Sequence, residues 1–246
     1  MNQDAPSPSP RHGLSLDLLI AVALLLLVLA ALWVAGYRPG EGQLGGEFRD
    51  LDWDHVDWNN HLWNLWDFRR VYLGQGSPLH TTSEFFPEGL RLFASQGDLL
   101  LKALGGGLAL FFTPDTTFLL VGVLLFWGNA LGGYLLGLTL TGDRLFGGLV
   151  CGLLLAFASP AAWAANTGNL EYGLWLWLCL YLVFLVRLLR RGAMADVVLA
   201  ALMGVCTVLG NYVFFFHLVL ASLVLVAFHF KGLGSRRAGR LGMMVG

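Results

Sequence analysis

Acidic and histidine side chains gather in one polar segment of this otherwise apolar chain, between about Asp50 and Asp98. A membrane protein concentrates ionisable groups where it handles water or a charged substrate, so we expect the function to lie in this segment. Asp52 and Asp54 form a D-x-D pattern, which can hold Mg²⁺ or Mn²⁺ against a phosphate. Among the ionisable residues of the segment are Asp50, Asp52, Asp54, His55, Asp57, His61, Glu84, Glu88 and Asp98.

Between Asp54 and Leu73 the polar and apolar residues alternate with a helical period. Spaced at about 100° per residue, the apolar side is formed by Trp58, Leu62, Leu65, Trp66, Tyr72 and Leu73. The opposite side is formed by Asp57, Asn60, His61 and Asn64. This pattern predicts an amphipathic helix that lies on the membrane surface, with its tryptophans at headgroup depth.

Asp57 and His61 are four residues apart, so their side chains are neighbours on this helix. A carboxylate beside an imidazole can act as a general base, hold a divalent ion together with Asp54, or form a solvated polar pair. Arg69 and Arg70 either meet a substrate phosphate or extend to lipid headgroups. Spacing alone leaves these alternatives open.

The composition indicates an integral membrane protein. The chain is 57% hydrophobic and 13% charged, whereas soluble domains carry about 25% charged residues. A net charge of −1 leaves no basic surplus for neutralising phosphates, which argues against nucleic acid as a partner. Cys151, Cys179 and Cys206 all lie in apolar runs, where cysteine usually acts as a small core residue.

Six apolar runs predict an all-α fold, a polytopic bundle of about six spanning helices with an outer loop that carries the amphipathic helix. The runs are Leu14–Ala35, Thr116–Leu138, Leu145–Ser159, Glu171–Leu189, Ala195–Leu209 and Tyr212–Phe230. The alternative for the first run is a cleaved signal peptide, whose apolar region should have only about 7–15 residues. Residues 99–112 are too few to span, so we expect an interfacial or re-entrant helix there, with Gly105–Gly107 marking a break or close packing.

Basic residues are sorted along the chain in a way that predicts its orientation. With a cytoplasmic N-terminus, every loop expected on the inner side carries arginine, as the positive-inside rule requires. Residues 1–13 are then a disordered cytoplasmic tail, 36–98 the outer loop, 116–230 the spanning bundle and 231–246 the cytoplasmic end. The inner basic residues are Arg144, Arg187, Arg190, Arg191, Lys231, Arg236, Arg237 and Arg240.

An ordered series of short motifs resembles bacterial GT-C-type membrane glycosyltransferase-like proteins. In the outer segment these are HLWNLW at residues 61–66, GQGSPLHTT at 74–82 and FFPEG at 85–89. Later come LLGLTLTG at 135–142, FASP at 157–160, GNLE at 168–171 and RLLRR at 187–191. The resemblance covers residues 50–230. It implies a polytopic enzyme that takes a sugar from a polyprenyl-phosphate carrier on the outer face of the membrane.

The resemblance also implies roles for individual residues. Asp57 stands at the family's acidic position, six residues before Trp63, and would deprotonate the acceptor as the catalytic base of an inverting transfer. His61, Asp54 or a divalent ion would position Asp57 and screen the phosphate. Glu171 would help bind the acceptor, although an acidic residue there also complements a helix dipole. The other residues that would contact substrate are Asp54, Asn64, Arg69, Arg70 and Glu88.

Two departures from the family pattern bear on completeness and partners. Family members are much longer, which predicts a fragment, a split gene product or a minimal relative, with a second polypeptide supplying further helices. The usual aromatic-proline pair is here Ser159–Pro160. The expected location is the bacterial inner membrane, as part of the cell envelope. The alternatives are a non-catalytic scaffold that binds lipid, or a transporter subunit, for which Asn129 and His217 are the candidate polar groups within the membrane.

Overall fold

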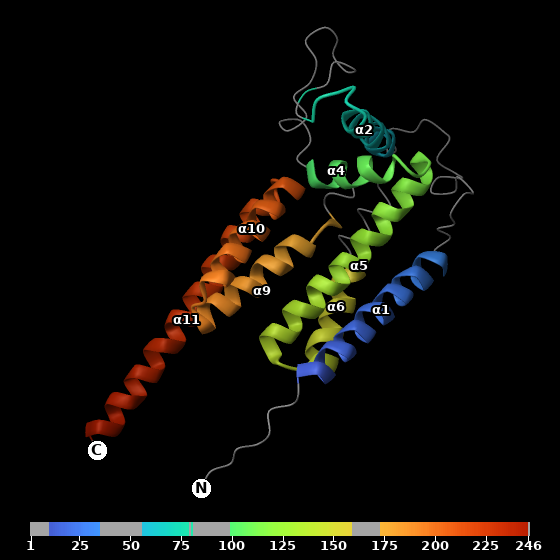
Figure 1. Ribbon diagram of the computed structural model, residues 1–246. Helices are drawn as coiled ribbons and strands as arrows, with labels where there is room; N and C mark the ends of the chain where they lie inside the picture. Colours follow the sequence, from blue (N-terminus) through green and yellow to red (C-terminus); the bar gives the residue numbers. More distant parts are fainter. Residues whose placement is uncertain (1–9, 35–55, 79, 81–98, 159–172, 246) are drawn as a thin grey trace.

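The computed structural model describes residues 10–34, 56–78, 80, 99–158 and 173–245, and nearly all of this part is helical (Figure 1). It contains no strand within these ranges, so the all-α prediction is confirmed. The helices are α1 (Pro10–Val34), α2 (Val56–Tyr72), α4 (Leu99–Leu108), α5 (Pro114–Thr141), the π-helix η2 (Arg144–Leu149), α6 (Val150–Ala156), α9 (Leu176–Arg191), α10 (Met194–Gly210) and α11 (Phe214–Val245).

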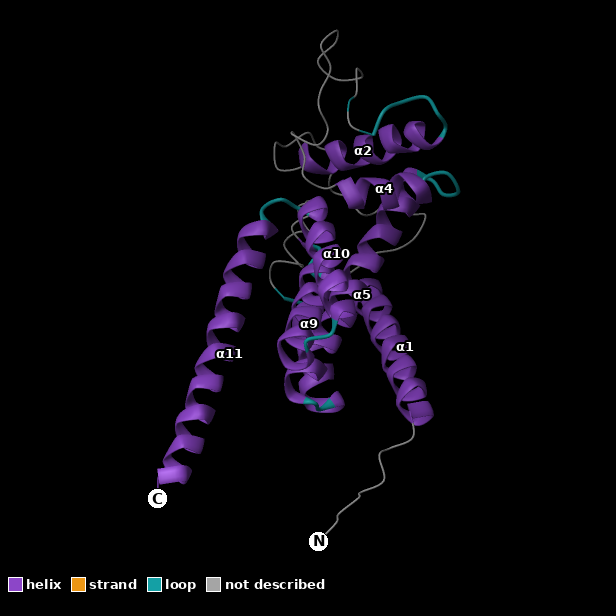
Figure 2. Ribbon diagram, turned by 60° about the vertical axis from the view of Figure 1, so that its left-hand side comes forward, coloured by secondary structure: helices purple, strands orange, loops and turns teal. Residues whose placement is uncertain are grey.

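The helices form a bundle with a two-helix layer across one end. The bundle consists of α1, α5, α6, α9, α10 and α11, and α5 packs against both α6 and α9. Helices α2 and α4 lie across the end of the bundle, with α4 between α2 and the long helices (Figures 1 and 2). Helix α2, the described helix of the polar segment, therefore lies across one end of an apolar bundle.

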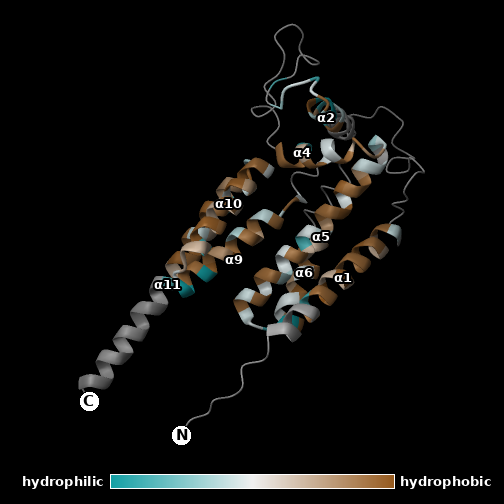
Figure 3. Cartoon of the chain, viewed as in Figure 1, coloured by the Kyte–Doolittle hydropathy of each residue, from teal (hydrophilic) through white to brown (hydrophobic). Residues whose placement is uncertain are grey.

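Two of the described helices are long enough and apolar enough to cross a membrane, over Leu16–Trp33 and Thr116–Thr141. Shorter apolar helical stretches, of 10–17 residues, are Leu99–Leu108, Arg144–Ala156, Met194–Gly210 and Phe214–His229, the last being the apolar part of α11. Many large apolar side chains of the bundle helices are nevertheless exposed, and hydrophobic residues predominate along these helices (Figure 3). Such surfaces mark contact with lipid or another protein. On α1 and α11 they include Leu18, Leu19, Leu26, Trp33, Phe216, Leu220, Leu223 and Phe228.

Helix α5 is the central helix, and its ends follow from local sequence. Thr113 caps its N-terminus by accepting a hydrogen bond from the Thr116 N–H, and Pro114 occupies the first turn, where its missing N–H costs nothing. Gly142 ends the helix in the left-handed conformation, with φ 76°, which glycine adopts without strain. Glycines also let α6 approach closely, since a Cβ on Gly133 would lie 2.7 Å from the Cys151 carbonyl oxygen.

Three of the predicted runs differ from the observed helices. The run predicted at Leu145–Ser159 begins as a π-helix, in which Asp143 accepts hydrogen bonds from the N–H groups of Leu145 and Phe146. In the run predicted at Glu171–Leu189, helix α9 begins at Leu176 and ends at Arg191, with Gly192 as its C-cap, and the first two residues of the run lie outside the described part. The last run extends beyond Phe230 to Val245. The predicted break at Gly210–Asn211 is present between α10 and α11.

Asn129 explains where α9 begins. Its side chain is fully buried in α5, its Nδ2 donates to the Gly173 carbonyl at 2.6 Å, and its Oδ1 accepts from the Trp175 N–H at 2.8 Å. The first N–H groups of a helix lack partners within the helix. Asn129 supplies one from a neighbouring helix, so α5 determines the start of α9. Both the nitrogen and the oxygen of the Asn129 amide are therefore hydrogen-bonded to backbone groups.

Candidate functional site

The candidate site is built on the packing of α2 against α4. Gly105 and Gly106 of α4 face α2, and a Cβ on Gly106 would lie 2.5 Å from the Phe68 Cβ and 2.8 Å from the Phe68 carbonyl carbon. A Cβ on Gly105 would collide with the Leu65 side chain. The Tyr72 hydroxyl donates to the Ala103 carbonyl at 3.0 Å. The glycines therefore provide close packing, one of the two predicted alternatives, and α4 continues through them without a break.

This packing predicts unequal effects of two neighbouring glycine substitutions. Gly106→Ala should destabilise the protein by about 1–3 kcal/mol, because the added methyl meets the backbone of Phe68 and α2 must move away. Gly107→Ala is the matched control in the same helix, since its Cβ has no neighbour closer than 3.7 Å. It should be neutral or stabilising, because alanine is the better helix former. Thermal unfolding in detergent measures both, and equal effects would contradict the observed contact.

Polar side chains are buried in this layer. Asn64 and Asp67 of α2 are 1% and 4% exposed, and Lys102 of α4 is 2% exposed. Burial of charged groups is costly unless they are paired, so such groups are retained where they hold or handle something. Neither Asp67 nor Lys102 was predicted as a site residue. Lys102 could have been noticed from the sequence, because it is the one charged residue among residues 99–112.

Arg70 fixes the C-terminal end of α2. Its guanidinium lies 4.0 Å from the Asp67 carboxylate and 4.9 Å from the centre of the Trp66 ring, and it donates to the Gln75 carbonyl at 3.4 Å. Arg69 is exposed, as a phosphate or headgroup contact requires. The two predicted basic residues thus differ, because Arg70 is held within the layer whereas Arg69 projects from it.

The other predicted site residues are only partly within the described structure. Asp57 and His61 lie in the first half of α2, one helical turn apart as predicted, and their side chains are outside the described part. Asp52, Asp54, Glu88 and Glu171 lie outside the described residues altogether. Within the described residues no group of histidine, cysteine or acidic side chains is placed to hold a metal ion. The Mg²⁺ or Mn²⁺ hypothesis, at Asp52 and Asp54 or at Asp54, Asp57 and His61, concerns side chains outside the described part and stays a prediction.

The predicted division of α2 into two faces is partly wrong. Asn64, predicted on the polar side, is buried, which is the part that is wrong, whereas Trp66, predicted on the apolar side at headgroup depth, is 44% exposed. Leu65 is buried as predicted. The physical reason is that α2 packs on another helix rather than directly on lipid. The close approach allowed by the α4 glycines selects the Asn64, Leu65 and Phe68 side as the buried face.

A second cluster of polar side chains joins the N-terminal part of α1 to the C-terminal half of α5 and the start of η2. The Tyr134 hydroxyl donates to Asp17 Oδ1 at 2.6 Å, and Arg144 Nε donates to the same oxygen at 3.0 Å. The hydrogen bond with Asp17, together with its charge, raises the pKa of Arg144, so the guanidinium stays charged. Further along α1, Trp127 Nε1 donates to the Ala21 carbonyl at 3.1 Å. We assign this group to the packing of α1 rather than to chemistry.

His217 is also engaged locally. Its Nδ1 lies 3.3 Å from the carbonyl oxygen of Val213, in the turn before α11, and its ring packs against those of Trp175 and Phe214. The amide of Asn129 likewise bonds to the residues at the start of α9. Both match the packing and hydrogen-bonding roles that are common for polar residues between membrane helices.

Comparison with known proteins adds no relative to this picture. No protein-family model, no curated protein and no solved structure matches the chain. A functional assignment therefore depends on its own residues and their arrangement.

Proposed function

We propose that the chain is a polytopic protein of the bacterial inner membrane, with its N-terminus in the cytoplasm and the α2–α4 layer on the outer face. One observation supports the membrane location, and a second supports the orientation. Leucine and phenylalanine side chains on α1 and α11 are exposed over surfaces that suit lipid. Arginine gathers at the end of the bundle opposite the α2–α4 layer, at Arg144, Arg187, Arg190 and Arg191.

We propose further that the chain is a GT-C-like glycosyltransferase, or the N-terminal part of one, that uses a polyprenyl-phosphate-linked sugar. The carrying observation is that α2, the helix with Asp57 and His61, is held across one end of the bundle by glycine contacts and buried polar side chains. A lipid-linked donor on the outer face would present its sugar at this end of the bundle, which supports the proposal. The test is transfer of radiolabelled sugar from a polyprenyl-phosphate carrier by the membrane-embedded chain.

The proposed mechanism assigns each role to the outer layer. Asp57 deprotonates the acceptor hydroxyl, the oxygen attacks the sugar carbon, and the lipid phosphate leaves with inversion at that carbon. Arg69 is exposed and contacts the phosphate, with Glu88 and Glu171 as further substrate contacts. Asp52 and Asp54 hold a divalent ion if one is used. Asn64 is buried and acts within the layer by holding α2.

A non-catalytic membrane scaffold is the second candidate. Helices α10 and α11 expose apolar side chains outward, among them Val198, Leu202, Phe216 and Leu220. Such a surface suits lipid or the helices of a second polypeptide. The transfer assay separates the two candidates, because a scaffold transfers no sugar even when the second polypeptide is present.

The proposed orientation predicts which positions are reachable from outside. A cysteine at Ser77, which is exposed just beyond α2, should react with a membrane-impermeant thiol reagent in intact cells. A cysteine at Ser235 in the C-terminal half of α11 should react only after the membrane is opened. The three native cysteines lie within helices, and the unmodified chain gives their background. Labelling of Ser235→Cys in intact cells would contradict a cytoplasmic end for α11.

A further inference from the structure

A basic pocket lies at the end of the bundle opposite the α2–α4 layer. Its volume is about 450 Å³, and it opens between the C-terminal end of α5 and that of α9. In the proposed orientation it faces the inner leaflet and the cytoplasm. The lining residues are Leu138, Thr139, Leu140, Thr141, Gly142, Arg187, Arg190 and Arg191.

Arg190 neutralises the carbonyl groups at the C-terminal end of α5, which would otherwise repel an anion in this pocket. The C-terminus of a helix carries partial negative charge on its unpaired carbonyl groups. Arg190 donates to the Thr139 carbonyl at 2.6 Å and to the Leu140 carbonyl at 3.5 Å, so it neutralises the end of α5. A guanidinium carries five N–H donors, and these contacts leave others available to a ligand.

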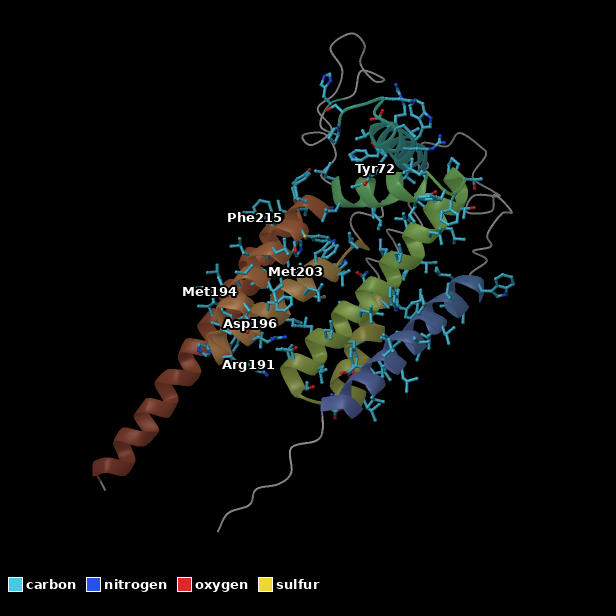
Figure 4. The ribbon with its side chains drawn as sticks, in the orientation of Figure 1. Tyr72, Arg191, Met194, Asp196, Met203 and Phe215 are labelled. Carbon is cyan, nitrogen blue, oxygen red and sulfur yellow. The ribbon has the colours of Figure 1, made fainter. Side chains whose placement is uncertain are left out.

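The acidic groups near the pocket are already engaged. Asp196, at the start of α10, is 2% exposed and lies 3.0 Å from Arg187 Nε (Figure 4). Asp143, which follows the lining residue Gly142, accepts hydrogen bonds from the backbone N–H groups of Leu145 and Phe146. Three arginines and the Asp196 carboxylate leave the pocket with a net charge of about +2.

Of the three arginines that line the pocket, Arg191 is the one whose guanidinium bonds to no described protein group. Its side chain is exposed at the last residue of α9, and it has no hydrogen bond or ion pair with any residue in the described part of the chain. Gly192 ends α9 at φ 69°, with its N–H bonded to the Leu188 carbonyl, and this cap fixes where Arg191 leaves the helix. The carbonyl groups at the end of α5 therefore account for Arg190, whereas Arg191 places its charge at the end of α9 and leaves its N–H donors unused within the described part of the chain.

We propose that this pocket binds a phosphate group, with Arg190 and Arg191 as its donors. Arginine suits phosphate because its planar fork of N–H groups matches two phosphate oxygens. The phosphate belongs either to an anionic lipid headgroup of the inner leaflet or to a soluble phosphate compound. The site is independent of sugar transfer on the outer face, and only the lipid source rests on the proposed orientation.

The test compares Arg191→Gln with a charge-matched control in the full chain. Arg236→Gln removes the same charge at the proposed inner end of α11, a helix that supplies none of the described lining residues. The probes are phosphatidylglycerol against phosphatidylcholine, titrated into detergent and followed by native mass spectrometry, and inorganic phosphate, followed by calorimetry. Near a membrane surface one arginine contributes about 1 kcal/mol to anion binding, which is about five-fold in affinity. We expect Arg191→Gln to weaken binding by about that factor and Arg236→Gln to leave it unchanged.

Each outcome decides the proposal. Preferential binding of phosphatidylglycerol that Arg191→Gln weakens identifies a lipid headgroup site. Saturable binding of inorganic phosphate with the same dependence, and without lipid preference, identifies a soluble ligand. Equal effects of the two variants, or no binding of either probe, would overturn the proposal. The binding experiment does not measure sugar transfer. If phosphate binding is absent, the proposed transferase activity is neither supported nor contradicted.

Discussion

Asp57→Asn should lower sugar transfer by about 10²–10⁴-fold, the usual contribution of a general base. The substitution keeps the size of the side chain and removes its ability to take a proton from the acceptor hydroxyl. The measurement is the initial rate of transfer from a polyprenyl-phosphate-linked sugar by the chain in proteoliposomes. A second polypeptide that supplies further helices is included if the chain requires one.

Asp50→Asn is the matched control for Asp57. It makes the same chemical change in the same acidic segment, before the start of α2 at Val56. We expect at most a few-fold loss of rate, and unchanged thermal unfolding for both variants. If Asp57→Asn transfers sugar at the rate of the parent chain, Asp57 is not the base, and Asp52 and Asp54 become the next candidates.

Asn129→Leu should have the largest effect on stability, about 2–4 kcal/mol of the free energy of unfolding. Leucine has a similar size but cannot bond to the Gly173 carbonyl or the Trp175 N–H, so each of these backbone groups loses its bond to Asn129 and keeps only the 3.1 Å hydrogen bond from the Trp175 N–H to the Gly173 carbonyl. Each such loss typically costs about 1–3 kcal/mol. The measurement is reversible unfolding in mixed detergent micelles, followed by circular dichroism.

Thr117→Val provides the control on the same helix. Thr117 is fully buried in α5, and its hydroxyl oxygen has no hydrogen-bond partner among the described residues. Valine has the same shape without the polar group, so this change should leave stability unchanged or raise it slightly. If Asn129→Leu is as mild as Thr117→Val, then Asn129 does not hold the start of α9.

Apolar periodicity predicted most of the helices because each one buries or exposes a continuous apolar surface. The amphipathic segment 54–73 is observed as α2, and the short run 99–112 contains α4, which lies across the bundle. The turn at Gly210–Asn211 was predicted from residues that end helices. Where α9 begins was not predictable from its own residues, since Asn129 is more than 40 residues away.

The candidate site was less predictable because helix contacts, rather than local pattern, decide which side chains are buried. An amphipathic model places Asn64 in water, yet the glycines of α4 bring that side of α2 into the layer. Asp67 and Lys102 become notable only when both helices are seen together. Asp17 is similar, because its partners Tyr134 and Arg144 are over 100 residues away in sequence.

Photo-crosslinking with a diazirine-bearing polyprenyl-phosphate sugar tests the proposed function most directly. It reports where the donor binds even if transfer needs a second polypeptide. The proposal predicts crosslinks within the outer segment and the α2–α4 layer, over residues 50–108, that unmodified donor competes away and inorganic phosphate does not. Crosslinks confined to α9–α11, or crosslinks that the unmodified donor fails to reduce, would contradict a lipid-linked sugar site in this layer.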